Sequence, residues 1–263
     1  MTSDQDATPQ STVHSLDEVR GVWRRSLLVR PDGTRDATGF VVWMQGLRHF
    51  VDLRQPAGRP CFAGVATAHD LTWLQLAWMA RQEGFAGELV LDGGFVEWRR
   101  SLDFQPPSGV PDSARLWFEG ATLVEQGRHA PYSERWEPLP AAAPRRDATA
   151  RLREGGRDAA VVRCDDRFMV MVGRDAALPP GASLPAILAT KPTLAEAQRL
   201  VACEISLGRV SSEGWRIERS TLPWREGAVM APRFVPGQKW LGAADGPAWD
   251  IVEADGDVAA LVA

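Results

Sequence analysis

The chain is poor in several residue types and patterns that mark particular protein classes. Lysine is nearly absent, since only Lys191 and Lys239 are lysines, and the net charge of −4 gives no reason to expect nucleic-acid binding. The three cysteines, Cys61, Cys164 and Cys203, form no CxxC pair and have no histidine at metal-ligand spacing. We therefore expect neither a disulfide framework nor a structural metal site.

Long hydrophobic runs are missing as well. No segment approaches the roughly 18 apolar residues of a membrane-spanning helix, and the polar N-terminus has neither the basic region nor the apolar core of a secretion signal. The sequence also contains no GxGxxG, Walker or GxSxG motif. We expect a cytoplasmic monomer or homodimer that contacts no membrane or nucleic acid and carries no cofactor.

Short extended segments separated by turns make up most of the chain. Residues 37–46 and 48–56 are expected to form a hairpin, and 61–67 a weaker strand. Apolar residues at helical spacing predict a helix over 70–84 that starts at Asp70, and a capping box that begins at Thr193 predicts a second one. This pattern is typical of a mainly β protein with antiparallel barrel architecture and two short helices.

The sequence divides into three parts. Residues 1–19 are expected to form a disordered leader, and 20–140 an N-terminal β-barrel domain. The stretch 138–150 is rich in proline and alanine, which favours a linker. Residues 150–263 are expected to form a C-terminal β-rich domain that packs on the barrel or completes it, so that one barrel and two barrels both remain open.

The sequence Trp-Arg-Arg-Ser-Leu occurs twice, at 23–27 and at 98–102. Alternation in a strand places the tryptophan and the second arginine of each copy on an apolar face, so Arg25 and Arg100 are expected to point inward. A buried guanidinium needs a partner, because leaving it unpaired is costly. Two interpretations remain open: a structural arginine packed on a tryptophan ring, or an arginine that holds a ligand anion.

The second copy is expected to keep this alternation to its end. Leu102 and Phe104 would then share the inward face with Trp98 and Arg100.

The residues Gly21-Val22-Trp23 resemble the Gly-x-Trp signature that opens the first strand of lipocalin-like (calycin) barrels. In that superfamily the tryptophan packs at the closed end of the barrel, commonly with an arginine over its ring. Over roughly residues 20–140 the chain resembles a family of poorly characterised bacterial and fungal lipocalin-like proteins. The resemblance implies an antiparallel barrel, a scaffold that hosts both binding and catalysis.

The densest group of chemically active residues lies in the stretch RHAPYSERWEP. His129, Tyr132 and Glu134 are candidate acid/base groups, and an extended backbone would place Tyr132, Glu134 and Trp136 on one face. In the alternative interpretation Tyr132 and Trp136 line a core, Glu134 neutralises an inward arginine, and His129 lies in a solvated turn.

Two further places are candidates. Trp224 and Arg225 are expected to form a barrel-closing contact with Glu226 as the partner of the arginine, or an anion site at the mouth of a pocket. His49 lies on a strand face with apolar neighbours, which fits a core histidine or a haem ligand.

We expect a protein that binds a small hydrophobic or amphipathic ligand, with an anionic one favoured. The alternative is an isomerase, lyase or hydrolase acting on a small aromatic or unsaturated substrate, with His129, Tyr132 and Glu134 as catalytic residues. A third class is an interaction module that uses Trp240 and Trp249. The expected ligand-binding residues are Trp23, Arg25, Trp98, Arg100, Trp136, Trp224 and Arg225.

Overall fold

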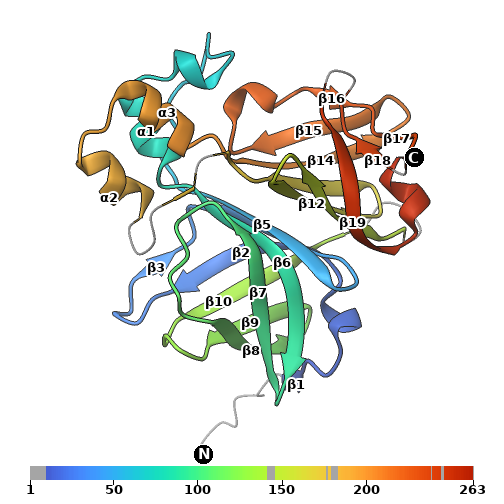
Figure 1. Cartoon of the computed structure of the whole chain (residues 1–263). Helices are drawn as coiled ribbons and strands as arrows, with labels where there is room; N and C mark the ends of the chain where they lie inside the picture. The colour runs from blue at the N-terminus through green and yellow to red at the C-terminus, as the bar shows by residue number, and fades with distance from the viewer. Residues whose placement is uncertain are drawn as a thin grey trace, which may run out of the picture.

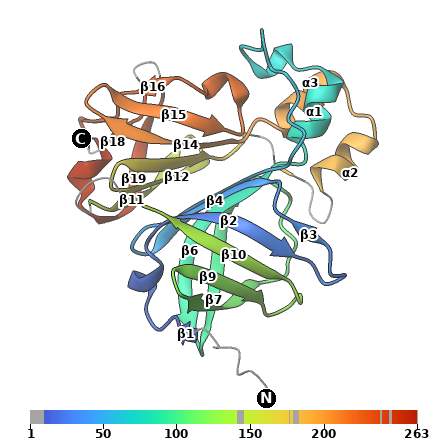
Figure 2. The same cartoon turned by 180° about the vertical axis from the view of Figure 1, so that it is seen from behind.

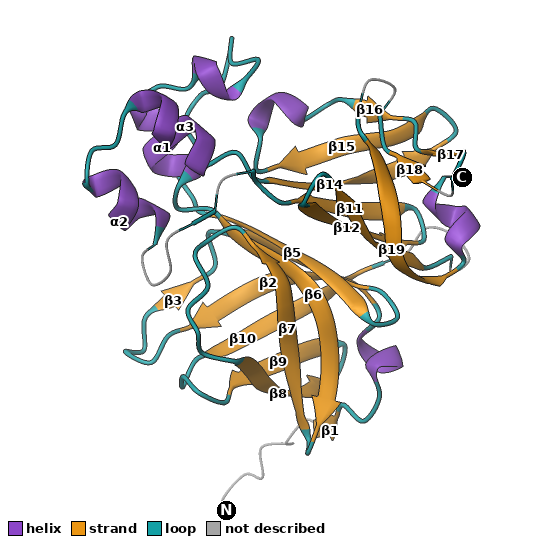
Figure 3. Ribbon diagram, viewed as in Figure 1, coloured by secondary structure: helices purple, strands orange, loops and turns teal. Residues whose placement is uncertain are grey.

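Two antiparallel β-sheets dominate the computed structural model, and the helices are few and short (Figures 1 and 3). The first sheet forms the lower half of the molecule in Figure 1 and the second lies above it. The mainly β fold class predicted from the sequence is confirmed. The structure describes residues 10–140, 146–175, 177–178, 183–237, 239–243 and 246–262.

The first sheet closes into a barrel of eight strands. Each strand pairs with the next one along the chain, and the last pairs with the first. This arrangement follows from short strands joined by tight turns, which favour pairing between neighbours in sequence. The barrel strands are β2 (Gly21–Val29), β4 (Phe40–Gln45), β5 (His49–Gln55), β6 (Glu83–Asp92), β7 (Phe95–Asp103), β8 (Asp112–Glu119), β9 (Thr122–Gly127) and β10 (Ser133–Leu139).

Two short strands extend this sheet beyond the barrel. β3 (Arg35–Asp36) pairs with β2, and β1 (Gln10–Thr12) pairs with β8. The 3-10 helix η1 (Leu16–Val19) follows β1. Residues 10–19 are therefore structured and do not belong to a disordered leader, because Val13 and Val19 are buried in the barrel core. The rest of the predicted leader, residues 1–9, lies outside the described residues.

The second sheet is open and curls into a half-barrel (Figure 2). The described residues therefore form one closed barrel, and not two. From one edge to the other the strands are β16 (Val229–Met230), β15 (Gly214–Ser220), β14 (Glu204–Ser211), β13 (Arg167–Val172), β12 (Arg157–Cys164), β11 (Ala148–Glu154), β19 (Ala248–Gly256), β18 (Lys239–Leu241) and β17 (Arg233–Val235).

The three α-helices gather beside the second sheet, at the upper left of Figure 1. They are α1 (Trp73–Met79), α2 (Leu184–Ala189) and α3 (Leu194–Leu200). The capping box at Thr193 is confirmed, whereas α2 is an additional helix that the sequence did not predict. α1 starts after Thr72, whose side chain accepts from the Gln75 N–H, and not after Asp70.

Two other sequence-based expectations about local structure are wrong. Residues 61–67 form no strand, and they precede the 3-10 helix η2 (Ala68–Asp70). Trp240 and Trp249 are buried in the core of the second sheet, so they offer no exposed contact patch. The remaining 3-10 helices are η3 (Pro223–Arg225) and η4 (Val258–Leu261). In the described part of the chain, no helix combines the length and the apolar character needed to span a membrane.

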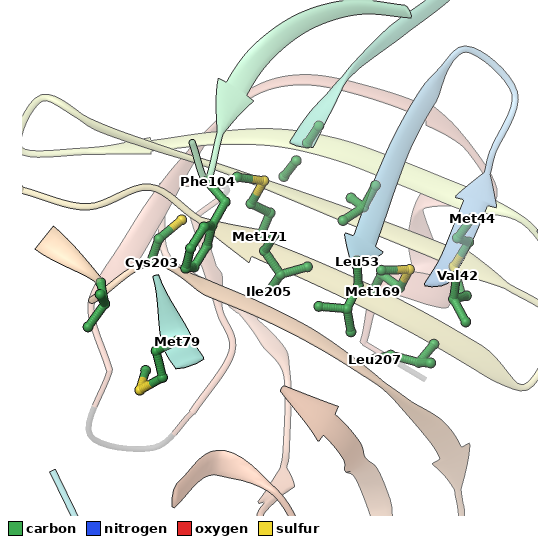
Figure 4. Packing of buried hydrophobic residues seen from close by; sticks show 14 of the residues in the cluster. Val42, Met44, Leu53, Met79, Phe104, Met169, Met171, Cys203, Ile205 and Leu207 are labelled. Carbon is green, nitrogen blue, oxygen red and sulfur yellow. The ribbon is translucent and has the colours of Figure 1, made fainter. Parts of the chain in front are cut away.

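The barrel and the second sheet share one hydrophobic core. Alternation in β4 sends Trp43 into the barrel and its neighbours Val42 and Met44 outward. These outward residues pack with Met169 of β13 and Leu207 of β14 (Figure 4). The outer surface of the barrel is thus covered on this side, and the barrel interior is left as a separate compartment.

Candidate functional site

Four tryptophan rings fill one half of the barrel interior. Trp43 lies among the other three, with its ring centroid 6.5 Å from that of Trp23, 5.7 Å from Trp98 and 5.9 Å from Trp136. All four are at most 6% exposed. The Trp23 Nε1–H donates to the Val19 carbonyl at 2.7 Å, which ties the ring to η1. This half of the barrel is a packed core closed by η1.

The first Trp-Arg-Arg-Ser-Leu copy contains a β-bulge at its serine. In β2, Arg25 pairs with Trp136 and Leu27 pairs with Arg135, so Ser26 has no counterpart on β10. A bulge of this kind adds one residue to one strand and bends it. The strand therefore changes direction directly after the inward arginine.

The second copy contains the same irregularity. In β7, Arg100 pairs with Gly87 and Leu102 pairs with Ala86, so Ser101 has no counterpart on β6. The extra residue breaks the alternation of faces that the sequence suggested.

The consequence of the second bulge corrects one sequence-based expectation. Trp98 lies inside the barrel, as predicted. Phe104 instead joins the core outside the barrel, and Leu102 packs against the same outer core.

Arg25 and Arg100 both point toward the other half of the barrel interior and meet carboxylates there. Arg25 Nη1 lies 2.5 Å from Glu134 Oε1, and the arginine side chain is 9% exposed. Arg100 is more accessible and pairs with Asp112, and its guanidinium lies 3.5 Å from the centroid of the Phe85 ring. The largely buried side chain of Arg25 has the carboxylate partner that its burial demands. Arg100 is exposed, and it stacks on a phenylalanine and not on a tryptophan.

A third arginine, Arg54 of β5, lies in the same half of the barrel interior as Arg25 and Arg100. We call this half the polar end of the barrel. Its Nε donates to Asp52 at 2.8 Å, and its Nη1 lies 3.7 Å from Glu134. Burial alone would lower the pKa of Arg54, but the charges of Asp52 and Glu134 outweigh it and hold this pKa well above its usual value. Burial raises the pKa of Asp52 to about 6 despite the opposing charge of Arg54.

Glu125 of β9 is the most perturbed carboxyl group of this end. Its two oxygens accept from the Tyr132 hydroxyl at 2.7 Å and from Trp136 Nε1 at 3.0 Å. Burial, followed by the charge of Glu134, raises the pKa of Glu125 to about 8. Burial and the Glu125 carboxyl also raise the pKa of Tyr132. At neutral pH Glu125 is therefore protonated and Tyr132 is neutral.

The charges at the polar end are close to balanced among the described residues. Arg25, Arg54 and Arg100 pair with carboxyl groups there, and the protonated Glu125 carries no charge near pH 7. Arg30 also lies 3.8 Å from Asp36, and the charge of Arg174 also acts on Asp103. The carboxyl groups are those of Asp36, Asp52, Asp103, Asp112, Glu125 and Glu134.

Two buried polar atoms of the barrel interior lack a hydrogen-bond partner among the described residues. One is the acceptor Glu134 Oε2, and the other is the donor Trp43 Nε1. Glu134 as a whole is 2% exposed. Such orphaned atoms are uncommon in folded proteins, and each calls for an explanation.

The structure leaves three of the expected site residues outside the barrel interior altogether. His129 is exposed in the turn before β10. Trp224 and Arg225 lie in η3 beside the second sheet, where Arg225 Nε donates to Glu204 at 3.0 Å. Glu226 is therefore not the partner of Arg225. It pairs with Arg59.

Sequence reasoning missed Asp52, Arg54, Asp112 and Glu125. A usable signal was present, since Asp52 and Arg54 alternate with Phe50 on one strand face. Charged residues that share a strand face with core residues indicate a polar region inside the barrel.

Comparison with known proteins gives evidence on the fold alone. No protein-family model matches the sequence. No curated protein matches it either. The structure is similar to the crystal structure of the uncharacterized protein YLR301w from Saccharomyces cerevisiae, with a TM-score of 0.52 and 10% sequence identity. The match covers 89% of this chain and 98% of the yeast chain, so the likeness extends over both sheets.

Proposed function

We propose that the chain binds a small amphipathic molecule at the polar end of the barrel. The observation that carries this proposal is Glu134 Oε2, a buried carboxylate oxygen that accepts no hydrogen bond from the described residues. Its other oxygen is held by Arg25, so the carboxylate is fixed in place. A ligand N–H or O–H group would supply the donor, and the apolar part of the ligand would lie against rings such as Trp136.

The charge of the ligand follows from the groups around it. The sequence favoured an anionic ligand because two arginines point inward. Each of these arginines is already paired with a carboxylate, however, and the unpartnered atom Glu134 Oε2 is an acceptor. An acceptor needs a donor, which supports a neutral or cationic donor group over an anion.

A matched series of ligands tests this proposal. Phenethylamine, phenethyl alcohol and phenylacetate share one ring and differ in their polar group, and binding is read from tryptophan fluorescence. We expect the amine and the alcohol to bind more tightly than the acid. Glu134→Gln should lower the affinity for the amine about 10-fold or more, because it removes one charge-assisted hydrogen bond.

Glu137→Gln is the matched control for this experiment. Glu137 lies on the same strand, but it accepts hydrogen bonds from Ser26 and Thr122, and the Ser26 bond is exposed. Equal amine affinities in wild type, Glu134→Gln and Glu137→Gln would overturn the proposal.

A second candidate function is acid/base catalysis at the same site. The specific observation is the carboxyl of Glu125, which has a pKa of about 8 and a hydrogen bond from Tyr132. A carboxylic acid that stays protonated near neutral pH is suited to donate a proton or a hydrogen bond. A panel of small aromatic enones and esters tests this candidate: turnover should fall in Glu125→Gln, and equal rates in the variant would remove Glu125 from the chemistry.

We also infer that the barrel is lipocalin-like and that the protein works in the cytoplasm. The single up-and-down barrel and the bond from Trp23 to η1 support the first inference. Cys61 and Cys203 are free thiols, which fits a reducing compartment.

A further inference from the structure

His49 lies at the seam between the barrel and the second sheet. It begins β5, is 1% exposed, and points out of the barrel toward β11 and β19. Its Nδ1 lies 3.2 Å from Thr149 Oγ1 and 3.3 Å from Asp255 Oδ2. This position does not fit the haem ligand considered from the sequence, because the ring does not face the barrel interior.

The other ring nitrogen faces two carboxylates. His49 Nε2 makes no hydrogen bond with the described residues, and it lies 3.7 Å from Glu88 Oε1 and 3.6 Å from Glu253 Oε2. Arg48 uses the other oxygens of these groups, at 3.1 Å from Glu88 Oε2 and 3.2 Å from Glu253 Oε1. The two oxygens that face the imidazole are therefore not the ones that hold Arg48, although Arg151 lies 3.4 Å from Glu253 Oε2.

We propose that His49, Glu88 and Glu253 bind a divalent transition-metal ion, best represented by Zn²⁺, at this seam. One ligand atom of each residue lies within 4.8 Å of the others. Zinc is bound by imidazole and carboxylate groups at about 2.0–2.2 Å, and sites with three protein ligands leave a fourth position for water. Small side-chain shifts bring the three atoms to that spacing.

The surroundings of the imidazole favour this assignment. A histidine that binds a metal commonly donates its second ring N–H to a carboxylate, which leaves the first nitrogen with a free electron pair. Thr149 Oγ1 lies within hydrogen-bond distance of Nδ1, and the carboxylate of Asp255 lies 3.3 Å from it, close enough to accept after a small shift.

The arginines nearby are compatible with a bound cation. Arg48 and Arg151 pair with the same carboxylates, and both are partly exposed. They can stay as outer partners that orient the carboxylates, or move aside into solvent. A bound ion would join β5 and β6 of the barrel to β19 of the second sheet, so binding would stabilise the folded chain.

Calorimetric titration of the chelator-treated full chain with ZnCl₂ tests the proposal. We expect one site in the wild type and a higher melting temperature when zinc is present. Glu88→Gln and Glu253→Gln keep the size of each side chain and should weaken binding by at least about 100-fold. Asp255→Asn, which removes only the outer partner, should weaken it about 10- to 100-fold.

Two variants serve as controls for other zinc ligands. Asp250→Asn removes a carboxylate of β19 that pairs with Lys239, and Cys61→Ser removes the exposed thiol. Both should bind zinc like the wild type. Absence of binding by folded wild type, unchanged binding in Glu88→Gln and Glu253→Gln, or loss of binding in Cys61→Ser would overturn the proposal.

Discussion

Ser26 and Ser101 occupy equivalent positions in two different strands. Each lies at the bulge of its Trp-Arg-Arg-Ser-Leu copy and donates its hydroxyl to a carbonyl on the neighbouring strand, Ser26 to Arg135 at 3.2 Å and Ser101 to Ala86 at 3.3 Å. The repeat is thus a bulge element used twice. It places a tryptophan in the packed half of the barrel and an arginine at the polar end.

The bulge in β7 requires a glycine on the strand opposite. A Cβ atom on Gly87 would lie 1.9 Å from the Arg99 carbonyl oxygen, a backbone atom that cannot move without shifting the strand. Gly87→Ala is therefore expected to lower the free energy of unfolding by about 3 kcal/mol or more. Urea denaturation measures this loss.

Gly39→Ala is the control for that measurement. A Cβ atom at Gly39 meets its nearest neighbour at 3.4 Å, an ordinary contact. A loss at Gly87 no larger than the loss at Gly39 would contradict the close approach at the bulge.

The ion pair between Arg25 and Glu134 is expected to matter for stability. Arg25→Met leaves the buried Glu134 with only Arg54, at 3.7 Å, as a compensating charge. We expect a loss of about 3 kcal/mol, since breaking a buried pair from one side leaves a charge uncompensated. The double variant Arg25→Met/Glu134→Gln should recover part of this loss.

The exposed neighbour Arg24 provides the matched substitution. Arg24→Met is expected to change the free energy of unfolding by no more than about 0.5 kcal/mol. Similar losses at both arginines in urea denaturation would show that Arg25 is not the buried partner of Glu134.

The carboxyl of Glu125 is expected to make stability depend on pH. Its folded-state pKa of about 8 lies above the value near 4.5 of the unfolded chain, so between these values the folded protein holds one proton more. Stability therefore falls as pH rises from about 4.5 to about 8. Glu125→Gln removes this contribution. The stability of the variant relative to wild type should therefore increase as pH rises over that range.

Urea denaturation of both proteins at about pH 5 and about pH 8 measures the effect. The pKa of Asp52 is raised to about 6, so this group also lowers the free energy of unfolding as pH rises to about 6. This decrease is the same in both proteins. A constant difference between wild type and Glu125→Gln at the two pH values would contradict the raised pKa.

The three cysteines are expected to differ in reactivity. Cys61 is exposed, whereas Cys164 and Cys203 are buried, and burial raises the pKa of Cys203 to about 11. A thiol reagent should therefore modify one cysteine quickly in the folded protein and all three in urea. Rapid reaction of more than one thiol without denaturant would show that the shared core between the sheets is open.

The sequence predicted those features that depend on local periodicity. The β4–β5 hairpin, the inward arginines Arg25 and Arg100 and the capping box at Thr193 all follow from short-range patterns. The bulge at Ser101 could not be predicted in this way. A bulge is defined by the pairing of two strands, so the sequence of one strand alone does not reveal it.

The candidate sites were harder to predict for the same reason. Arg54 of β5 approaches Glu134 of β10 only because the barrel closes, and His49 meets Glu253 only because the second sheet packs on the barrel. Such contacts depend on the closure of the whole fold, which no residue spacing encodes.

Native mass spectrometry of the purified full chain, incubated with a mixed library of small amphipathic amines, alcohols and acids, tests the central claim most directly. The claim is that the polar end of the barrel binds a small molecule through Glu134. We predict one-to-one adducts that are richest in amines and alcohols and are reduced in Glu134→Gln. No adducts with the wild type, or the same adducts with both proteins, would contradict it.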